Sequence, residues 1–289
     1  MDTIAATVRL AVRAEARVGE GPVWDPGSGR LHWVDILAGA VHTSDLANGW
    51  TTTRVLPTLV GAVSPKRTGG LVAAVTEGFA DVSDEYVVRQ HVLGDGIRMN
   101  DAKCDPDGRF WAGSTAMDFA AGRGALHVLE ADWSTRVVLD GLTQPNGLGW
   151  SPDGRTFYLA DTAEREISAF DVFGNQLAGR RLLCSFADSD VPDGLCVDAA
   201  GCLWVALWGG GRLVRIAPDG RMLSTLRVPV VQPSSCAFVG PDLDLLCVTS
   251  ACEGIEPADN AEDGTSYDGS VLIVAGLGVS GVPVAGFAG

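Results

Sequence analysis

Two carboxylates and one amide occupy equivalent positions of an internal repeat. Glu20, Asn146 and Asp193 each stand five residues before a turn rich in Pro, Asp or Gly. Carboxylate and amide oxygens are the ligands that hard divalent cations such as Ca²⁺, Mg²⁺ and Mn²⁺ prefer. Two carboxylates that meet in apolar surroundings repel each other unless a cation or protons intervene. We therefore hypothesise that the three side chains converge on one divalent cation.

A second interpretation of these residues is local. Asn146-Gly147 and Asp193-Gly194 are dipeptides typical of tight hairpin turns. A turn explains each pair taken alone, whereas the shared position in the repeat favours a common site, and Glu20 is not a turn-forming residue. The other three units carry at this position Leu59, Asn100 and Ser235.

Arg98 precedes Asn100 by two residues, so in a strand both side chains point to the same side. A guanidinium there suits the hydroxyl, carbonyl or carboxylate groups of a polar ligand. The alternative is a surface charge paired with Asp95 or Asp101, and the sequence leaves both interpretations open.

The element that must position these residues is a strand-and-turn unit that occurs six times. Short apolar runs follow each turn, and long helical periodicity is absent. The turns begin 39 to 47 residues apart, at Asp25, Ser64, Asp105, Ser151, Asp198 and Gly240. This pattern predicts an all-β fold, a six-bladed β-propeller of four-stranded antiparallel blades, formed by residues 1–289 as one domain.

The order of strands within a unit predicts where the parts of the propeller lie. In the first unit we expect strands at 22–24, 30–35, 40–44 and 50–55, and residues 7–18 are expected to close the ring as the outer strand of the last blade. In an antiparallel meander, the start of the inner strand and the loop between strands two and three share one face, here called the upper face. Two longer loops, within 114–123 and 251–269, fall on it.

Composition excludes several classes of partner. The chain has 21 Lys and Arg against 36 Asp and Glu, a net charge of −15, which excludes the basic footprint of nucleic-acid or anionic-membrane binding.

The uncharged run 271–289 contains five glycines and Pro283, so a last strand plus a tail is favoured over a membrane span. No secretory leader is visible, and seven cysteines without a C-x-x-C pair fit a reduced, cytoplasmic protein. A disulfide or zinc site at Cys196 and Cys202 is the less favoured alternative.

The sequence resembles the senescence marker protein/gluconolactonase/luciferin-regenerating enzyme family along nearly its whole length. The motifs that carry the resemblance are Gly19–Trp24, Arg98–Asp101, Pro145–Leu148 and Pro192–Gly194. The resemblance implies a six-bladed propeller with a divalent cation at the top of the channel, held by Glu20, Asn146 and Asp193. It also implies that Arg98 and Asn100 hold the substrate, with Asp118 as the acidic candidate in the 114–123 loop.

These inferences predict a divalent-metal-dependent lactonase. The substrate is expected to be a sugar lactone, such as gluconolactone or a pentonolactone, and the product its aldonic acid. Ca²⁺ is the first expectation for the cation, with Mn, Mg, Zn or Fe as alternatives. The attacking water loses its proton either to Asp193 or through its contact with the cation, and the sequence leaves both open.

Two other functions fit the same fold. One is a metal-dependent esterase or organophosphate hydrolase, and the other is a non-catalytic sugar-binding propeller. The protein is expected to be a monomer or a small homo-oligomer.

Overall fold

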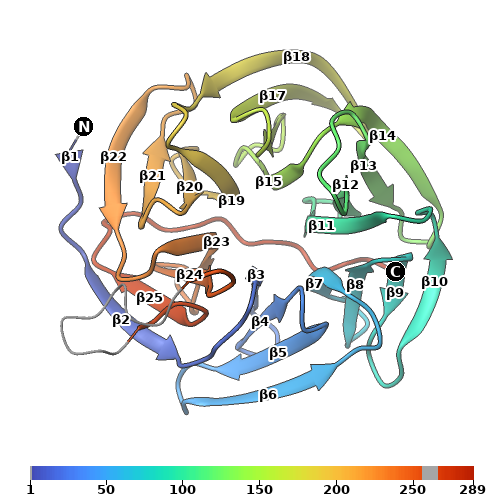
Figure 1. Cartoon of the computed structure of the whole chain (residues 1–289), viewed down its shortest axis with the longest axis horizontal. Coiled ribbons are helices and arrows are strands. Elements are labelled where there is room, and N and C mark those ends of the chain that lie inside the picture. Colours follow the sequence, from blue (N-terminus) through green and yellow to red (C-terminus); the bar gives the residue numbers. More distant parts are fainter. Residues whose placement is uncertain (1, 256–265) are drawn as a thin grey trace.

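Six antiparallel sheets surround a central channel, as the computed structural model shows for residues 2–255 and 266–289 (Figure 1). Each sheet runs outward from an inner strand that lines the channel to an outer strand at the rim. The predicted six-bladed β-propeller is confirmed.

The strands of the first three blades follow one another along the chain. Blade one consists of β3 (Gly19–Asp25), β4 (Arg30–Asp35), β5 (Ala40–Asp45) and β6 (Trp50–Val55). Blade two consists of β7 (Val60–Pro65), β8 (Leu71–Val75), β9 (Gly78–Asp81) and β10 (Val87–His91). Blade three consists of β11 (Ile97–Cys104), β12 (Phe110–Ala116), β13 (Gly124–Leu129) and β14 (Thr135–Leu142).

The last three blades include both ends of the chain. Blade four consists of β15 (Pro145–Trp150), β16 (Thr156–Asp161), β17 (Glu166–Phe173) and β18 (Gln176–Ser185). Blade five consists of β19 (Val191–Val197), β20 (Leu203–Trp208), β21 (Arg212–Ile216) and β22 (Met222–Arg227), with the short β1 (Asp2–Thr3) paired in parallel to β22. Blade six consists of β23 (Gln232–Val239), β24 (Leu245–Ala251), β25 (Val271–Ala275) and β2 (Thr7–Val12).

The ring closes as the sequence predicts, because the N-terminal β2 pairs antiparallel with β25. The closing strand is shorter than the expected segment 7–18 and ends at Val12. The parallel pairing of β1 with β22 in blade five is a feature that the repeat did not predict.

A buried aspartate closes two of the recurring turns, at Asp105 and Asp198. Asp105 Oδ1 accepts hydrogen bonds from the backbone N–H groups of Asp107 and Arg109, while its Oδ2 accepts one from Trp111 Nε1 at 2.8 Å. Asp198 makes the same kind of contacts in blade five. One carboxylate thus closes the turn and ties it to the second strand of the blade. The turns lie on the lower face, opposite the upper face defined above.

Large apolar side chains fill the spaces between neighbouring blades. Between blades three and four, Trp111 packs against Trp150 and Phe157 with ring centroids 5.7 and 5.5 Å apart. Such contacts fix each blade against the next, which holds the inner strands rigidly around the channel.

The segment after β25 crosses the lower opening of the channel (Figure 1). It pairs with the lower turns of three blades: Ser280 O accepts from Ala199 N, Phe287 O accepts from Arg67 N, and Ala288 N donates to Gly108 O. The expected strand plus tail is thereby confirmed. Within the residues that the structure describes, no helix is long and apolar enough to cross a membrane.

Phe287 anchors this tail and gives a stability prediction. Its side chain is fully buried against Trp133, with ring centroids 5.2 Å apart. We expect Phe287→Ala to lower the free energy of unfolding by about 3–5 kcal/mol, because it leaves a cavity in the core between blades two and three. Urea denaturation measures this change. The matched control is Phe173→Ala, which removes a side chain that is 65% exposed and should change stability by less than about 0.5 kcal/mol.

Candidate functional site

The three predicted cation ligands lie near the upper ends of inner strands. Glu20 is the second residue of β3, Asn146 the second of β15 and Asp193 the third of β19. The hairpin-turn interpretation of Asn146-Gly147 and Asp193-Gly194 is therefore wrong, because both pairs lie inside strands.

An irregularity in the strand pairing accompanies each of these positions. In all six blades, the register between the inner strand and the second strand shifts at this level. The shifts lie between Glu20 and Val23, Val60 and Ala62, Met99 and Ala102, Pro145 and Leu148, Pro192 and Leu195, and Pro233 and Ser235. A β-bulge re-aims a side chain that regular alternation would direct into the sheet packing.

The glycines of these pairs are explained by close approach of neighbouring inner strands. A Cβ on Gly147 would lie 2.5 Å from the carbonyl oxygen of Asp193, and one on Gly194 would lie 2.1 Å from Ser235 Oγ. The strands therefore crowd together at the level of the polar residues, which brings those residues into reach of one another.

Asn146 links two of the inner strands through its side-chain amide. Its Nδ2 donates to the Asp193 carboxylate and, at 3.0 Å, to Thr162 Oγ1. Glu20 Oε2 accepts a hydrogen bond from Gly21 N at 2.7 Å. Glu20, Asn146 and Asp193 are each buried.

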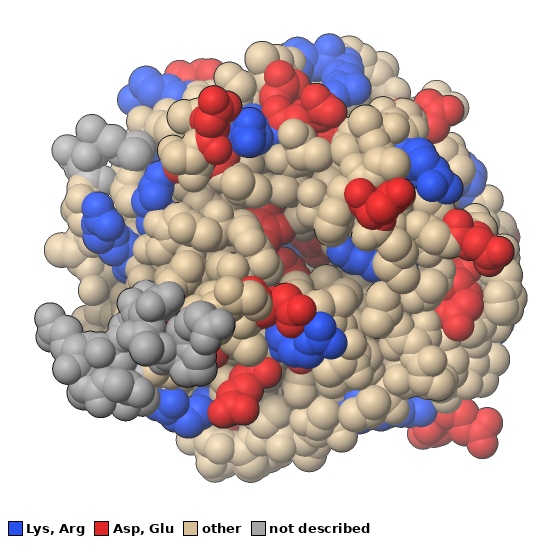
Figure 2. Space-filling view, viewed as in Figure 1, with Lys and Arg blue, Asp and Glu red and all other residues tan. Residues whose placement is uncertain are grey.

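Burial and mutual repulsion determine the protonation of the carboxyl groups. Burial, and then the charges of Asp193 and Asp101, raise the pKa of Glu20 well above its ordinary value. Burial and then Asp101 do the same to the pKa of Asp193. The two predicted acids are thus close enough to feel each other's charge, and the upper channel favours an added positive charge or protons. Figure 2 shows acidic side chains on the floor of the central hollow.

Asp101 is a residue of this region that the sequence argument considered only as a partner of Arg98. It is 4% exposed, and its Oδ2 has no hydrogen-bond partner among the described residues. Burial raises the pKa of Asp101, and the nearby Lys103 ammonium opposes that rise. Its position directly after Asn100 in the Arg98–Asp101 motif is the signal that could have identified it.

Arg98 and Asn100 are hydrogen-bonded to each other beside the predicted cation ligands. Arg98 Nη1 donates to Asn100 Oδ1 at 2.8 Å and to Met99 O at 3.0 Å, and Asn100 Nδ2 donates to Pro145 O at 3.0 Å. Among the described residues, Arg98 makes these hydrogen bonds and no ion pair with Asp95 or Asp101, so the surface-charge interpretation has no support. Burial lowers the pKa of Arg98, while the charges of Glu20 and Asp193 oppose that shift.

Asp118 lies apart from these contacts. It is exposed in the loop between β12 and β13, where its Oδ1 accepts a hydrogen bond from Ala120 N at 3.1 Å. Among the described residues, no hydrogen bond or ion pair joins Asp118 to the buried polar group, so its substrate-binding role stays a prediction. In the second long loop, residues 256–265 lie outside the described part of the chain.

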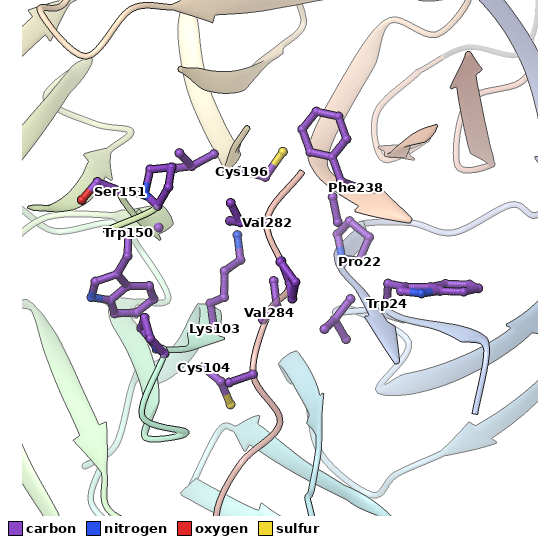
Figure 3. Close-up of a pocket in the computed structure, with 18 residues that line it drawn as sticks. Pro22, Trp24, Lys103, Cys104, Trp150, Ser151, Cys196, Phe238, Val282 and Val284 are labelled. Atoms are coloured by element: carbon purple, nitrogen blue, oxygen red, sulfur yellow. The ribbon is translucent and has the colours of Figure 1, made fainter. Parts of the chain in front are cut away.

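The lower half of the channel is mainly apolar, unlike the polar upper half. A cavity of about 250 Å³ lies above the tail and is lined mainly by apolar side chains, with Trp24, Trp150 and Phe238 around it (Figure 3). None of the predicted site residues lines this cavity. The Lys103 ammonium enters it and donates to Leu148 O and Leu195 O at 3.0 and 2.7 Å.

The cysteines of this lower region bear on an alternative that the sequence left open, a disulfide or zinc site at Cys196 and Cys202. All seven cysteines are free, and Cys196 Sγ lies 3.5 Å from Cys236 Sγ, on the inner strand of the next blade. The alternative of a disulfide or zinc site at Cys196 and Cys202 has no support in this arrangement.

Comparison with known proteins identifies the family. The sequence profile described as "SMP-30/Gluconolactonase/LRE-like region" matches residues 18–252. The chain belongs to this family. The SMP-30/gluconolactonase resemblance drawn from the motifs is thus confirmed, and the match spans all six inner strands.

Individual members of the family are similar over nearly the whole chain. Regucalcin of Xenopus laevis is 32% identical, over 98% of each chain. Pentonolactonase XacC of Haloferax volcanii is 34% identical, over 96% of this chain and 97% of its own. The crystal structure of a calcium-binding protein, regucalcin, from Agrobacterium tumefaciens has a TM-score of 0.90 and 26% identity, over 99% of both chains.

Proposed function

We infer that this protein is a divalent-cation-dependent lactonase that hydrolyses a sugar lactone to its aldonic acid. The observation that carries this proposal is the convergence of Glu20, Asn146 and Asp193 in the upper channel, beside a polar pair formed by Arg98 and Asn100. The similarity to a pentonolactonase supports the reaction class and the sugar substrate.

The donor set fits one hard divalent cation. Two buried carboxylates and an amide oxygen offer oxygen ligands only. Burial first, and then the charges of neighbouring carboxylates, raise the pKa values of Glu20 and Asp193. No cluster of three His, Cys, Asp or Glu side chains that could hold a metal occurs in the described part of the chain. The proposed site therefore depends on the amide of Asn146 as its third protein ligand. Ca²⁺ is the first candidate, and the name of the Agrobacterium protein supports that choice.

The residues of the chain have separate tasks in this reaction. In lactone hydrolysis, water adds to the carbonyl carbon, the ring C–O bond breaks, and the departing oxygen takes a proton. Arg98 has guanidinium N–H groups beyond the one bound to Asn100, and these can bind substrate hydroxyls or the ring oxygen. Asp193 Oδ1 is engaged by Asn146, which leaves Oδ2 to accept the proton of the attacking water. A divalent cation, when bound, supplies Lewis-acid polarisation of the lactone carbonyl.

The test is a matrix of cations and substrates assayed on the purified protein. We expect hydrolysis of gluconolactone or a pentonolactone, loss of turnover on chelation, and recovery when Ca²⁺ or Mn²⁺ is restored. Turnover that survives exhaustive chelation would overturn the proposed cation dependence. The polar upper channel favours a sugar lactone over an apolar aryl ester or organophosphate, so a preference for the aryl ester would favour the esterase alternative. Sugar binding without turnover would favour the non-catalytic alternative.

The free cysteines also support a cytoplasmic location. All seven are unpaired, most of them buried in the blades, which agrees with the proposal of a reducing, cytoplasmic environment.

A further inference from the structure

Thr162 lies where two of the proposed cation ligands meet. It directly follows β16, in the loop between the second and third strands of blade four, and is 8% exposed. Its backbone is fixed, because Thr162 N donates to Gln144 O at 3.0 Å and Thr162 O accepts from Arg165 N at 3.1 Å. A buried hydroxyl on a fixed backbone can hold its neighbours in one geometry.

The hydrogen bonds of this hydroxyl have only one consistent direction. Thr162 Oγ1 lies 2.8 Å from Pro192 O, and a carbonyl oxygen only accepts, so the hydroxyl proton points at Pro192. The oxygen of Thr162 then has only lone pairs to offer to the side chain of Asn146, 3.0 Å away. The group of Asn146 that faces Thr162 must therefore be the NH₂ group.

This direction settles which way the Asn146 amide is turned. Its two N–H groups face Thr162 Oγ1 and the Asp193 carboxylate, both of which accept. The reversed amide would set its oxygen against Thr162 Oγ1, whose proton is already given to Pro192 O. Oδ1 is thus directed away from both and accepts no hydrogen bond from any residue in the described part of the chain. An amide oxygen is the atom that a divalent cation binds.

We propose that Thr162 is a positioning residue that turns the Asn146 amide oxygen toward the cation and holds β15 and β19 at the spacing the site requires. This inference rests on the proposed function. Through Pro192, the same hydroxyl is bonded to the residue that precedes Asp193, so one side chain positions ligands from two blades.

The expected effect is on cation affinity. Thr162→Val keeps the shape of the side chain and removes the hydroxyl, which leaves the Asn146 amide held by the Asp193 carboxylate alone. We expect the dissociation constant for Ca²⁺ or Mn²⁺, measured by titration calorimetry in the absence of substrate, to rise about 10–100-fold. Thr162→Ser retains the hydroxyl and should bind within about twofold of the wild type. In lactone hydrolysis at saturating cation, Thr162→Val should recover most of the wild-type turnover.

The matched control is Thr225→Val. Thr225 is as buried as Thr162, but its hydroxyl has no hydrogen-bond partner among the described residues. This variant should bind the cation like the wild type. If the Thr162→Val protein does not fold, the same titration compares Thr162→Ala with Thr162→Ser. Only serine keeps the hydroxyl, so the two variants should differ in cation affinity.

The possible outcomes separate the two proposals. A wild-type protein that binds no divalent cation overturns the proposed function. A wild-type protein that binds the cation, together with a folded Thr162→Val or Thr162→Ala variant that binds it equally tightly, overturns the role of Thr162 and leaves the proposed function intact.

Discussion

Replacing Asp193 by alanine is expected to reduce the rate of lactone hydrolysis by at least about a thousandfold. The change removes a proposed cation ligand and the proposed acceptor of the water proton together, and general-base catalysis alone is commonly worth about 10²–10⁴-fold. Asp193 is 5% exposed and hydrogen-bonded to Asn146, so its carboxylate is held in place within the proposed site.

The measurement compares kcat/KM for a sugar lactone with the Ca²⁺ dissociation constant of each variant. Asp193→Asn keeps the size of the side chain and separates loss of charge from loss of packing. The exposed Asp188, whose one ion pair among the described residues is a surface contact with Arg165, provides the control Asp188→Ala. An Asp193→Ala protein that is folded and keeps more than a tenth of the wild-type rate would refute the assigned role.

Replacing Glu20 by glutamine is expected to change stability in opposite directions with and without a divalent cation. Without the cation, burial and then the charges of Asp193 and Asp101 raise the pKa of Glu20. An acid whose pKa is raised by folding binds its proton more tightly in the folded state, so stability falls as the pH rises through the interval between the unfolded and folded pKa values. Glutamine is neutral and similar in shape to the protonated acid. The cation-free variant should therefore be more stable than the wild type at pH 8, by about 1–3 kcal/mol.

With the cation present, the order should reverse. A ligand at 100 times its dissociation constant stabilises the folded state by about 2.7 kcal/mol, and Glu20→Gln should lose most of this gain because it loses an anionic ligand. Melting temperatures with chelator and with Ca²⁺, at pH 5 and pH 8, measure both effects, and the cation-free difference should shrink at pH 5. Glu85→Gln, at an exposed position, is the control. A Glu20→Gln protein that is no more stable than the wild type in chelator, or equally stabilised by Ca²⁺, would contradict the proposed site.

Much of the fold was predictable because its signals are local. A turn such as the one at Asp105 is closed by bonds between residues a few positions apart, and the turn at Asp198 in another unit is closed in the same way. The spacing of these turns predicts the number of blades, and alternation along an antiparallel meander predicts which loops share a face. The closing strand β2 was predicted from position in the repeat, since blade six otherwise lacks an outer strand.

The chemistry of the candidate site was predictable in part. The position five residues before each turn identified the two carboxylates and the amide, and period-two alternation identified Arg98 beside Asn100. The turn interpretation of Asn146-Gly147 failed because the same dipeptide serves two purposes: glycine frees the backbone of a hairpin, and it also lets a second strand approach closely.

The sequence by itself determined the propeller, its family and the kinds of atom that reach the upper channel, because repeat length, turn chemistry and side-chain type are written in short stretches of chain. Only the tertiary structure decided where those atoms point. The register shift in every inner strand, the burial of Asp101, the hydroxyl of Thr162 between two blades and the tail beneath the channel all depend on groups brought together from distant parts of the chain. Their geometry is set by packing between blades, which no single stretch of sequence encodes.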